Sequence, residues 1–244
     1  MLDRATTLDV LRDGEIEVIG RIVGSSNNAM LVTVTRFCPD PEPAQVLRAV
    51  YKPTIGERPL NDFPDGTLAR REVAAWHVSE ASGWAIVPPT ILRDGPFGEG
   101  MVQWFVEADP AVDIVGMILE DDPRLRRMAV LDAVMNNTDR KGGHILAVDG
   151  GRQLHGVDHG VCFSAVPKLR TVLWGWRGQP LDRDELDGLE RIRAALDGAL
   201  GTELRGLLSR TEVRATIRRT DALLSSAVFP FPSPTWPAVP WPPF

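Results

Sequence analysis

The chain of 244 residues carries 27 basic and 33 acidic side chains, which gives a formal net charge of −6. This acidic balance excludes the broad basic surface that binding to nucleic acid or to an anionic membrane requires, so we expect neither as a partner. There is no run of about 18 apolar residues, and the two cysteines, Cys38 and Cys162, lie far apart in the sequence. We therefore expect no stable membrane insertion, no disulfide framework and a cytoplasmic protein.

The first hundred residues are dominated by patterns that favour strands. Residues 15–23 and 29–37 are rich in β-branched side chains and bracket a polar connection, which predicts a hairpin. The elements expected after it are a strand at 46–52, a helix at 67–82 and strands at 86–92 and 100–106. Together they predict a β-rich N-lobe over residues 1–105.

The pattern becomes helical after residue 109. Asp122 is a suitable N-cap and Pro123 a suitable first helical residue, so a helix is expected from there to about Asn136. Two short strands should follow, and then three helices at 182–198, 201–209 and 211–226. These segments predict a mostly helical C-lobe over residues 106–228. The expected fold class is therefore α+β, with two lobes and a cleft between them.

The tail, residues 229–244, has an unusual composition, with seven prolines and five aromatic residues. Repeated proline excludes a helix and favours an extended polyproline conformation. So many aromatic side chains are unusual in a solvated linker. We expect the tail to dock on the body of the protein through Phe229, Trp236 and Trp241, and to bury the two tryptophans. The alternative is a peptide that docks in the aromatic groove of a partner protein.

Lysine is rare in this chain. Of the 27 basic residues only Lys52, Lys141 and Lys168 are lysine, and the others are arginine. A chain with this bias keeps lysine where a compact ammonium differs from a planar guanidinium. Lys52 ends a predicted strand directly before a proline, so it is the lysine most strongly marked as functional.

Two polar segments offer groups that phosphoryl transfer needs. This chemistry depends on a cation for the phosphates, on ligands for a metal and on a group near the incoming hydroxyl. The segments 132–144, DAVMNNTDRKGGH, and 155–160, HGVDHG, supply the last two, and Lys52 supplies the cation. A structural interpretation stays open, because Asn137 and Asp139 could simply cap and turn the end of a helix.

Three motifs resemble those of the phosphatidylinositol 3-/4-kinase-like superfamily. LDAVMNNTDRKGGHIL is similar to its catalytic loop, HGVDHGVCF to its metal-binding element and AVYKP to its nucleotide-binding lysine strand. The likeness spans roughly residues 16–165 and keeps the order and spacing of the three elements. The chain is identified as a small bacterial member, similar to the HipA-type kinases. The resemblance implies a kinase-like fold that binds ATP in the cleft between the lobes.

The resemblance also implies roles for individual residues. Lys52 would contact the phosphates of ATP, and Glu72 would orient it through an ion pair. Asp139 would be the catalytic acid or base, with Arg140 bracing the loop around it. Asp158 would hold the divalent metal between the phosphates.

Further implied contacts surround the nucleotide. Lys141 would complete the catalytic group beside Asp139. The polar connection of the first hairpin would cover the phosphates, and the link between the lobes would hold the adenine. The residues concerned are Ser25, Ser26 and Asn27 in the hairpin and Gln103 and Trp104 in the link. The alternatives are a solvated charge for Glu72 and a simple core role for the aromatic side chains of the link.

His144 departs from the superfamily pattern, because it stands where the second metal ligand is usually asparagine. An imidazole ligates a metal only when it is neutral, and it suits Mn²⁺ better than Mg²⁺. We therefore expect ATP and a divalent metal, Mn²⁺ or Mg²⁺, as cofactors. His144 and Asp158 would be the metal ligands, and activity would be higher with Mn²⁺.

These features predict an ATP-dependent kinase that transfers phosphate to a hydroxyl acceptor. The favoured acceptor is a protein Ser or Thr, including the kinase itself, with Ser164 and Thr171 as candidates. A phosphatidylinositol or small-molecule kinase is the second hypothesis, although the sequence has no dense basic cluster for a phosphoinositide headgroup. A nucleotide-binding pseudokinase with a regulatory role is the third, and His144 is the feature that suggests it.

Overall fold

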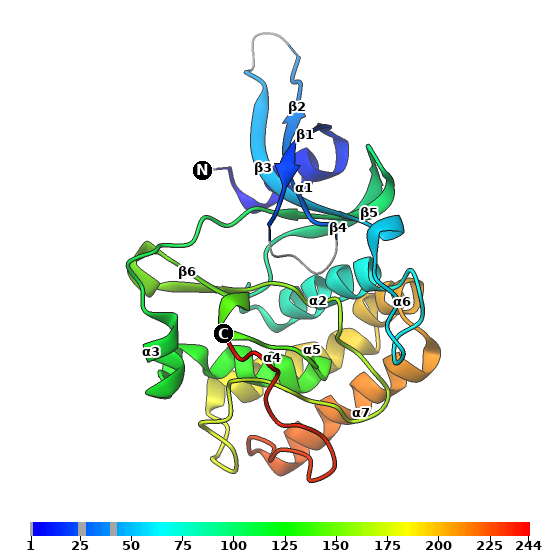
Figure 1. The fold of residues 1–244 in the computed structure, drawn as a ribbon. Helices are drawn as coiled ribbons and strands as arrows, with labels where there is room; N and C mark the ends of the chain where they lie inside the picture. The colour runs from blue at the N-terminus through cyan, green and yellow to red at the C-terminus, as the bar shows by residue number, and fades with distance from the viewer. Residues whose placement is uncertain (1, 24–27, 40–42) are drawn as a thin grey trace.

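A computed structural model describes residues 2–23, 28–39 and 43–244 (Figure 1). It confirms the predicted fold class, because an antiparallel sheet from the first hundred residues lies against a mostly helical part (Figure 1). None of the helices in these ranges is both long and apolar enough to cross a membrane.

The sheet has five strands in the order β1-β2-β3-β5-β4, and every neighbouring pair is antiparallel. The N-terminal elements are α1 (Arg4–Asp13), β1 (Glu15–Arg21), β2 (Met30–Arg36), β3 (Gln45–Pro53), η1 (Thr54–Gly56), α2 (Leu68–Ser82), β4 (Thr90–Gly95) and β5 (Gly98–Trp104). The predicted hairpin, third strand and helix are all present. The tip of the hairpin, residues 24–27, lies outside the described residues.

Helix α1 was not predicted from the sequence. It begins at Asp3, whose side chain accepts a hydrogen bond from the backbone N of Thr6. Val10 and Leu11 of α1 are buried in a cluster with side chains of β2 and β3. The helix therefore covers one face of the sheet.

Side chains along β3 point alternately to the two faces of the sheet, and this alternation decides on which face Lys52 lies. Ala49 and Tyr51 pack in the cluster with α1. Successive side chains of a strand point to opposite faces, so Lys52 lies on the far side, where α2 packs. There Val73 of α2 contacts Met101 of β5. The pairing of β3 with β5 places Lys52 directly opposite Met101, and so next to α2.

Strand β4 begins at Thr90, whereas the sequence predicted a strand from residue 86. The preceding residues 86–89 are buried, but the N–H groups of the first two do not join the sheet. Those of Ile86 and Val87 donate to Ser79 Oγ of α2. The next two residues are prolines, which have no N–H to offer to a neighbouring strand.

The helical part is formed by α3 (Ile114–Leu119), η2 (Pro123–Leu125), α4 (Arg126–Met135), η3 (Gly142–His144), β6 (Ile145–Val148), η4 (Asp149–Gly151), β7 (Gln153–Gly156), α5 (Arg183–Leu196), α6 (Ala199–Leu207) and α7 (Arg210–Ser226). Asp122 caps the turn before α4, as predicted. Asn136 ends α4 in the left-handed conformation, with φ at 51°. One apolar cluster joins α2 to the helices of this part.

The tail leaves α7 and runs along the helical part toward the middle of the molecule (Figure 1). Phe229 is 3% exposed, and its backbone exchanges hydrogen bonds with Gln179 and Gly178. Its ring lies 6.0 Å from that of Trp176. Trp241 is 88% exposed, so the expectation that it is buried is wrong. The prolines around it fix the backbone direction, and the ring points away from the body.

Candidate active site

Lys52 lies between two carboxylates that come from different parts of the fold. Its Nζ is 2.6 Å from Glu72 Oε1 on α2 and 2.7 Å from Asp158 Oδ1 after β7. Burial alone would lower the pKa of Lys52, but the charges of Asp158 and Glu72 outweigh it and raise the pKa. The ammonium group therefore stays charged at neutral pH.

Glu72 is buried, and both of its oxygens have partners. Oε2 accepts a hydrogen bond of 2.8 Å from the backbone N of His159. Burial raises the pKa of Glu72, although the charge of Lys52 opposes this. Glu72 is thus not a solvated charge. It fixes both the ammonium of Lys52 and the backbone that follows Asp158.

Asp158 has the left-handed backbone conformation, with φ at 60°. This conformation is uncommon for residues other than glycine, and such residues concentrate at functional sites. The charge of Lys52 holds the pKa of Asp158 well below its usual value, although burial opposes this. Its second oxygen, Oδ2, lies 3.4 Å from His144 Nε2.

Asp139 lies in the segment 137–144, which the sequence predicts to be the catalytic loop and which keeps that name below. Its backbone N donates to Asn137 Oδ1 at 3.0 Å, so Asn137 does turn the chain after α4. The carboxylate of Asp139 is left between two cations, with Oδ2 at 3.4 Å from Lys141 Nζ and Oδ1 at 3.8 Å from Arg170 Nη2. The structural interpretation therefore applies to Asn137, and the catalytic role of Asp139 stays a prediction.

Arg140 braces the catalytic loop from inside. The residue is 0% exposed, and its guanidinium donates to both carboxylate oxygens of Asp132. It also donates to the carbonyl oxygens of His144 and Val157 and lies 2.6 Å from His159 Nε2. A side chain buried in this way does not contact a substrate. Arg140 therefore positions the loop, and Asp132 is its buried acceptor.

A cavity of about 370 Å³ opens in front of the catalytic loop. Asp139 and Asp158 both line it, together with Arg170. Asp62 and Phe63, from the segment between η1 and α2, also line it. A reacting group in this cavity would have access to both carboxylates.

His144 and Asp158 are the residues that fit a metal. Burial lowers the pKa of His144, although Asp158 opposes this, so the ring is neutral and can ligate. One imidazole nitrogen and one carboxylate oxygen suit a divalent cation. Within the described ranges, no group of three or more His, Cys, Asp and Glu side chains is arranged to hold a metal unaided. Phosphate oxygens would have to complete the coordination, as they commonly do for Mg²⁺.

Comparison with known proteins defines the family. No family model matches the chain. Protein Rv2133c of Mycobacterium tuberculosis is 44% identical over 271 aligned positions, which cover 96% of this chain and 94% of Rv2133c. The chain belongs to the Rv2133c family. Phosphatidylinositol 4-kinase gamma 4 of Arabidopsis thaliana is 28% identical over 191 positions, which cover 67% of the chain but only 34% of that kinase.

Two solved structures share the fold of this member of the Rv2133c family. The Helicobacter pylori proinflammatory kinase CtkA is 15% identical, with a TM-score of 0.54 over 90% of this chain and 94% of CtkA. Hydra Fam20, solved with sugar, is 12% identical, with a TM-score of 0.57 over 91% of this chain and 87% of Fam20. The fold is therefore kinase-like, as the three motifs predicted.

The two residues expected at the link between the lobes lie on different faces of the sheet. Gln103 shares the face of Lys52 and Met101, and its Nε2 donates to Thr90 Oγ1 at 2.8 Å. Trp104 packs on the opposite face, against the cluster around α1. Only Gln103 is thus turned to the side of the sheet where Lys52 lies.

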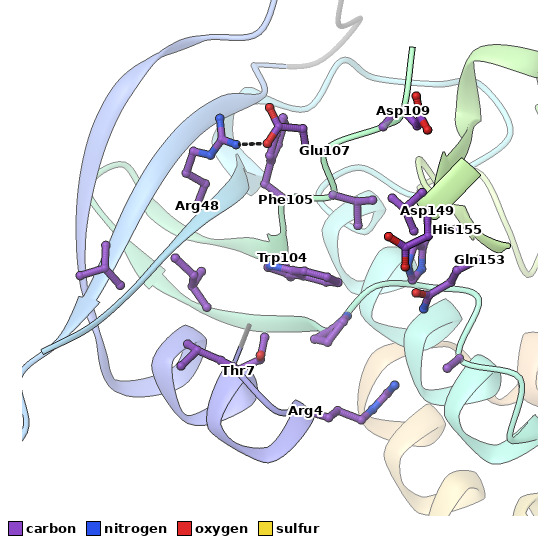
Figure 2. A pocket seen from close by; sticks show the side chains of 18 residues that line it. Arg4, Thr7, Arg48, Trp104, Phe105, Glu107, Asp109, Asp149, Gln153 and His155 are labelled. Carbon is purple, nitrogen blue, oxygen red and sulfur yellow. Dashed lines mark hydrogen bonds and ion pairs between the residues drawn. The ribbon is translucent and has the colours of Figure 1, made fainter. Parts of the chain in front are cut away.

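Trp104 lines a second and larger cavity of about 760 Å³. Figure 2 shows its ring in the centre of this cavity, with His155 beside it and the Arg48–Glu107 ion pair near the rim. None of the expected catalytic or metal-binding residues lines this cavity. Of the residues expected to be catalytic or metal-binding, Asp139 and Asp158 line the smaller cavity instead.

The remaining candidate residues either lie outside the described residues or are buried. Ser25, Ser26 and Asn27 lie outside the described residues. Ser164 and Thr171 are both buried, and the Thr171 hydroxyl donates to a carboxylate oxygen of Asp132. Neither hydroxyl is open to a phosphate donor in this conformation.

Sequence reasoning gave no catalytic role to Arg170. Its Nε donates to the carbonyl oxygen of Thr138 at 2.7 Å, and its guanidinium reaches Asp139. Arg170 follows the recognised motifs in a segment without regular structure, so no spacing rule connects it to the catalytic loop. Its position depends on the path of residues 164–172, which pass under the loop through hydrogen bonds to Asn136 and Asn137.

Proposed function

We propose that this protein is an ATP-dependent phosphotransferase that phosphorylates a hydroxyl group. The observation that carries the proposal is the bridge formed by Lys52, which joins Glu72 on the sheet side to Asp158 on the helical side. Asp158 lines the same cavity as Asp139. In this proposal Lys52 would neutralise the phosphates, Asp158 would hold a metal and Asp139 would accept the proton, which are the groups that phosphoryl transfer requires.

The residues would divide the work as follows. Lys52 neutralises the phosphates of ATP and is kept in place by Glu72. Asp139 accepts the proton of the acceptor hydroxyl while the oxygen of that hydroxyl forms a bond to the γ-phosphorus. The bond from that phosphorus to the bridging oxygen breaks, and ADP leaves with the electron pair. A divalent metal held by His144 and Asp158 would supply further charge neutralisation.

For the acceptor, we propose first a protein Ser or Thr, including residues of the kinase itself. The buried hydroxyls of Ser164 and Thr171 argue against these two as targets in this conformation. Thr235 is exposed and is followed by Trp236, whose ring lies 5.1 Å from Lys168 Nζ. Lys168 pairs with Asp62, at the wall of the smaller cavity. Thr235 is therefore the hydroxyl to examine first for self-phosphorylation.

A lipid or small-molecule acceptor is the second candidate. Two observations favour it: the similarity to a phosphatidylinositol 4-kinase over two thirds of the chain, and the size of the smaller cavity. A volume of about 370 Å³ lies within the range of small-ligand sites. Arg170 on its wall would suit an acceptor that carries an anionic group.

One experiment separates these candidates. Purified full-length protein would be incubated with γ-labelled ATP and Mg²⁺ or Mn²⁺, alone and with phosphatidylinositol vesicles, with Asp139→Asn as the control. Label on the chain, mapped by mass spectrometry, supports self-phosphorylation, and label in the lipid fraction supports the second candidate. If the parent binds nucleotide but transfers no more label than Asp139→Asn does, the proposed activity is contradicted and the pseudokinase hypothesis is favoured.

A further inference from the structure

The end of the tail lies against the catalytic loop. The backbone N of Gly142 donates a hydrogen bond of 2.8 Å to the carbonyl oxygen of Pro243. The Phe244 ring occupies the space that a Cβ on Gly142 would need. Figure 1 shows the C-terminus in the middle of the molecule, below β6. Since Asp139 and Gly142 belong to the same short loop, the tail contacts the loop that carries the proton acceptor.

A second contact joins the tail to a segment that pairs with the loop. The carbonyl oxygen of Ala238 accepts hydrogen bonds from the backbone N of Thr171, at 3.0 Å, and from Trp174 Nε1, at 2.8 Å. Thr171 forms a β-bridge with Arg140 of the catalytic loop. The tail thus supports the segment on which the loop rests.

A third contact lies at the rim of the smaller cavity. The ring of Trp236 packs on Lys168, whose Nζ is 2.8 Å from Asp62 Oδ2. Asp62 and Asp139 both line that cavity. Residues 236–244 therefore touch three segments that surround Asp139, although they are far from all of them in the sequence.

We propose that residues 236–244 position the catalytic loop for phosphoryl transfer. This inference rests on the proposed function, because it assigns the loop a reaction to perform. The loop contains two adjacent glycines, Gly142 and Gly143, and glycine leaves a backbone with more conformational freedom than any other residue. The contacts of Pro243 and Phe244 restrict the loop at this point. Transfer reactions are sensitive to displacements of about 1 Å, so loss of the restriction lowers kcat.

The first test removes the Phe244 ring. Phe244→Ala should lower kcat on the order of 10-fold and leave the KM for ATP close to that of the parent, since Lys52 and Glu72 are untouched. The control is Phe231→Ala, which removes a tail ring that packs over Gly178 rather than over the loop. A kcat of Phe244→Ala equal to that of Phe231→Ala would overturn the proposal.

The second test is a double-mutant cycle with Gly142. Gly142→Ala adds a methyl group that overlaps the Phe244 ring, so it should lower kcat in the parent but cause little further loss in Phe244→Ala. Gly143→Ala, whose methyl would meet no atom within 4 Å, measures the effect of stiffening the loop alone. Losses that simply add would show that loop and ring act independently, against the proposal.

Hydrogen exchange gives a readout that needs no activity. The amide of Gly142 donates to Pro243, so exchange of the peptide covering 137–144 should become faster in Phe244→Ala and stay unchanged in Phe231→Ala. Equal exchange in both variants would refute the positioning role. A parent protein that transfers no phosphate would contradict the proposed function, and the exchange measurement would still decide whether the tail orders the loop.

Discussion

At the scale of single residues, Lys52 depends on its small head group. Its Nζ lies 2.6 Å from one carboxylate and 2.7 Å from another, and the side chain is 16% exposed. A guanidinium is wider and planar, so it cannot occupy this position without moving Glu72 or Asp158. The preference of this chain for arginine elsewhere makes the lysine at this position a requirement of the site.

We therefore expect Lys52→Arg to lose activity although it keeps the charge. kcat/KM should fall by about 100-fold or more, the size of effect seen when one group that stabilises charge is removed. Steady-state kinetics with ATP would measure it, and circular dichroism would verify the fold. Activity within a factor of about two of the parent would show that Lys52 does not contact the phosphates.

His144 carries a separate prediction about the metal. Because imidazole suits Mn²⁺ better than Mg²⁺, the parent should be more active with Mn²⁺, and His144→Asn should shift the preference toward Mg²⁺. Titration of activity with each ion gives the ratio directly. Equal activity with the two ions in both proteins would exclude His144 as a ligand.

The residues of the candidate site were accessible to sequence reasoning, but the face of the sheet on which each side chain lies was not. The resemblance in three motifs pointed to Lys52, Glu72, Asp139 and Asp158. In the structure Lys52 bridges Glu72 and Asp158, and Asp158 lines one cavity with Asp139. The orientation of Trp104 depends on the register of β5 against β3, and a shift of one residue reverses every side chain of a strand. No local pattern in the sequence determines that register.

At the scale of elements, α2 connects the site to the helical core. Arg71 and Glu72 are adjacent on this helix but serve different partners. Arg71 donates to Glu212 Oε1 of α7 at 2.6 Å and to the carbonyl oxygen of Cys162 at 2.8 Å. The buried Arg71–Glu212 pair thus fixes the helix that presents Glu72 to Lys52.

This pair predicts a pH dependence of stability. Burial raises the pKa of Glu212, but hydrogen bonds from Ser209 and Arg71 outweigh this and lower it overall. A carboxylate whose pKa is lower in the folded state stabilises the protein above its unfolded pKa, about 4.3, and this contribution is lost as the pH falls through the folded value. Glu212→Gln should therefore cost about 3 kcal/mol at pH 7 and clearly less at about pH 3.5.

Urea unfolding at the two pH values measures the difference. The matched control is Glu17→Gln, which changes an exposed carboxylate on β1 and should alter stability by less than about 0.5 kcal/mol at either pH. A loss for Glu212→Gln that is the same at both pH values would mean that the ionised pair contributes nothing beyond packing.

Two helices show why element prediction was incomplete. Helix α1 has only three buried residues, Thr7, Val10 and Leu11, so its apolar stripe is too narrow to stand out from a polar N-terminal segment. Helix α3 is shorter than two turns and ends before a long enough period can be read. Both form because tertiary packing, rather than local propensity, stabilises them.

At the scale of the whole molecule, the tail connects the helical part to the catalytic loop. It begins at Phe229, whose ring lies 4.7 Å from the Arg126 guanidinium on α4 and close to Trp176. It ends at the catalytic loop. Because the tail joins the helices to the loop, its docking should affect both the stability of the fold and the candidate site. Substitutions near Phe229 should change mainly stability, and substitutions near Phe244 should change mainly the site.

The last prediction uses two aromatic residues of the tail that differ in burial. Phe229 is 3% exposed, so Phe229→Ala should cost about 3 kcal/mol and lower Tm by about 6–12 °C. Trp241 is 88% exposed, so Trp241→Ala should leave Tm within about 1 °C of the parent.

Differential scanning calorimetry would compare both variants with a chain that lacks residues 229–244, whose Tm should fall at least as much as that of Phe229→Ala. A deletion that leaves Tm unchanged would show that the tail does not pack on the body in solution. The exposed Trp241 and its neighbouring prolines would then be better explained as a peptide that docks in the aromatic groove of a partner protein.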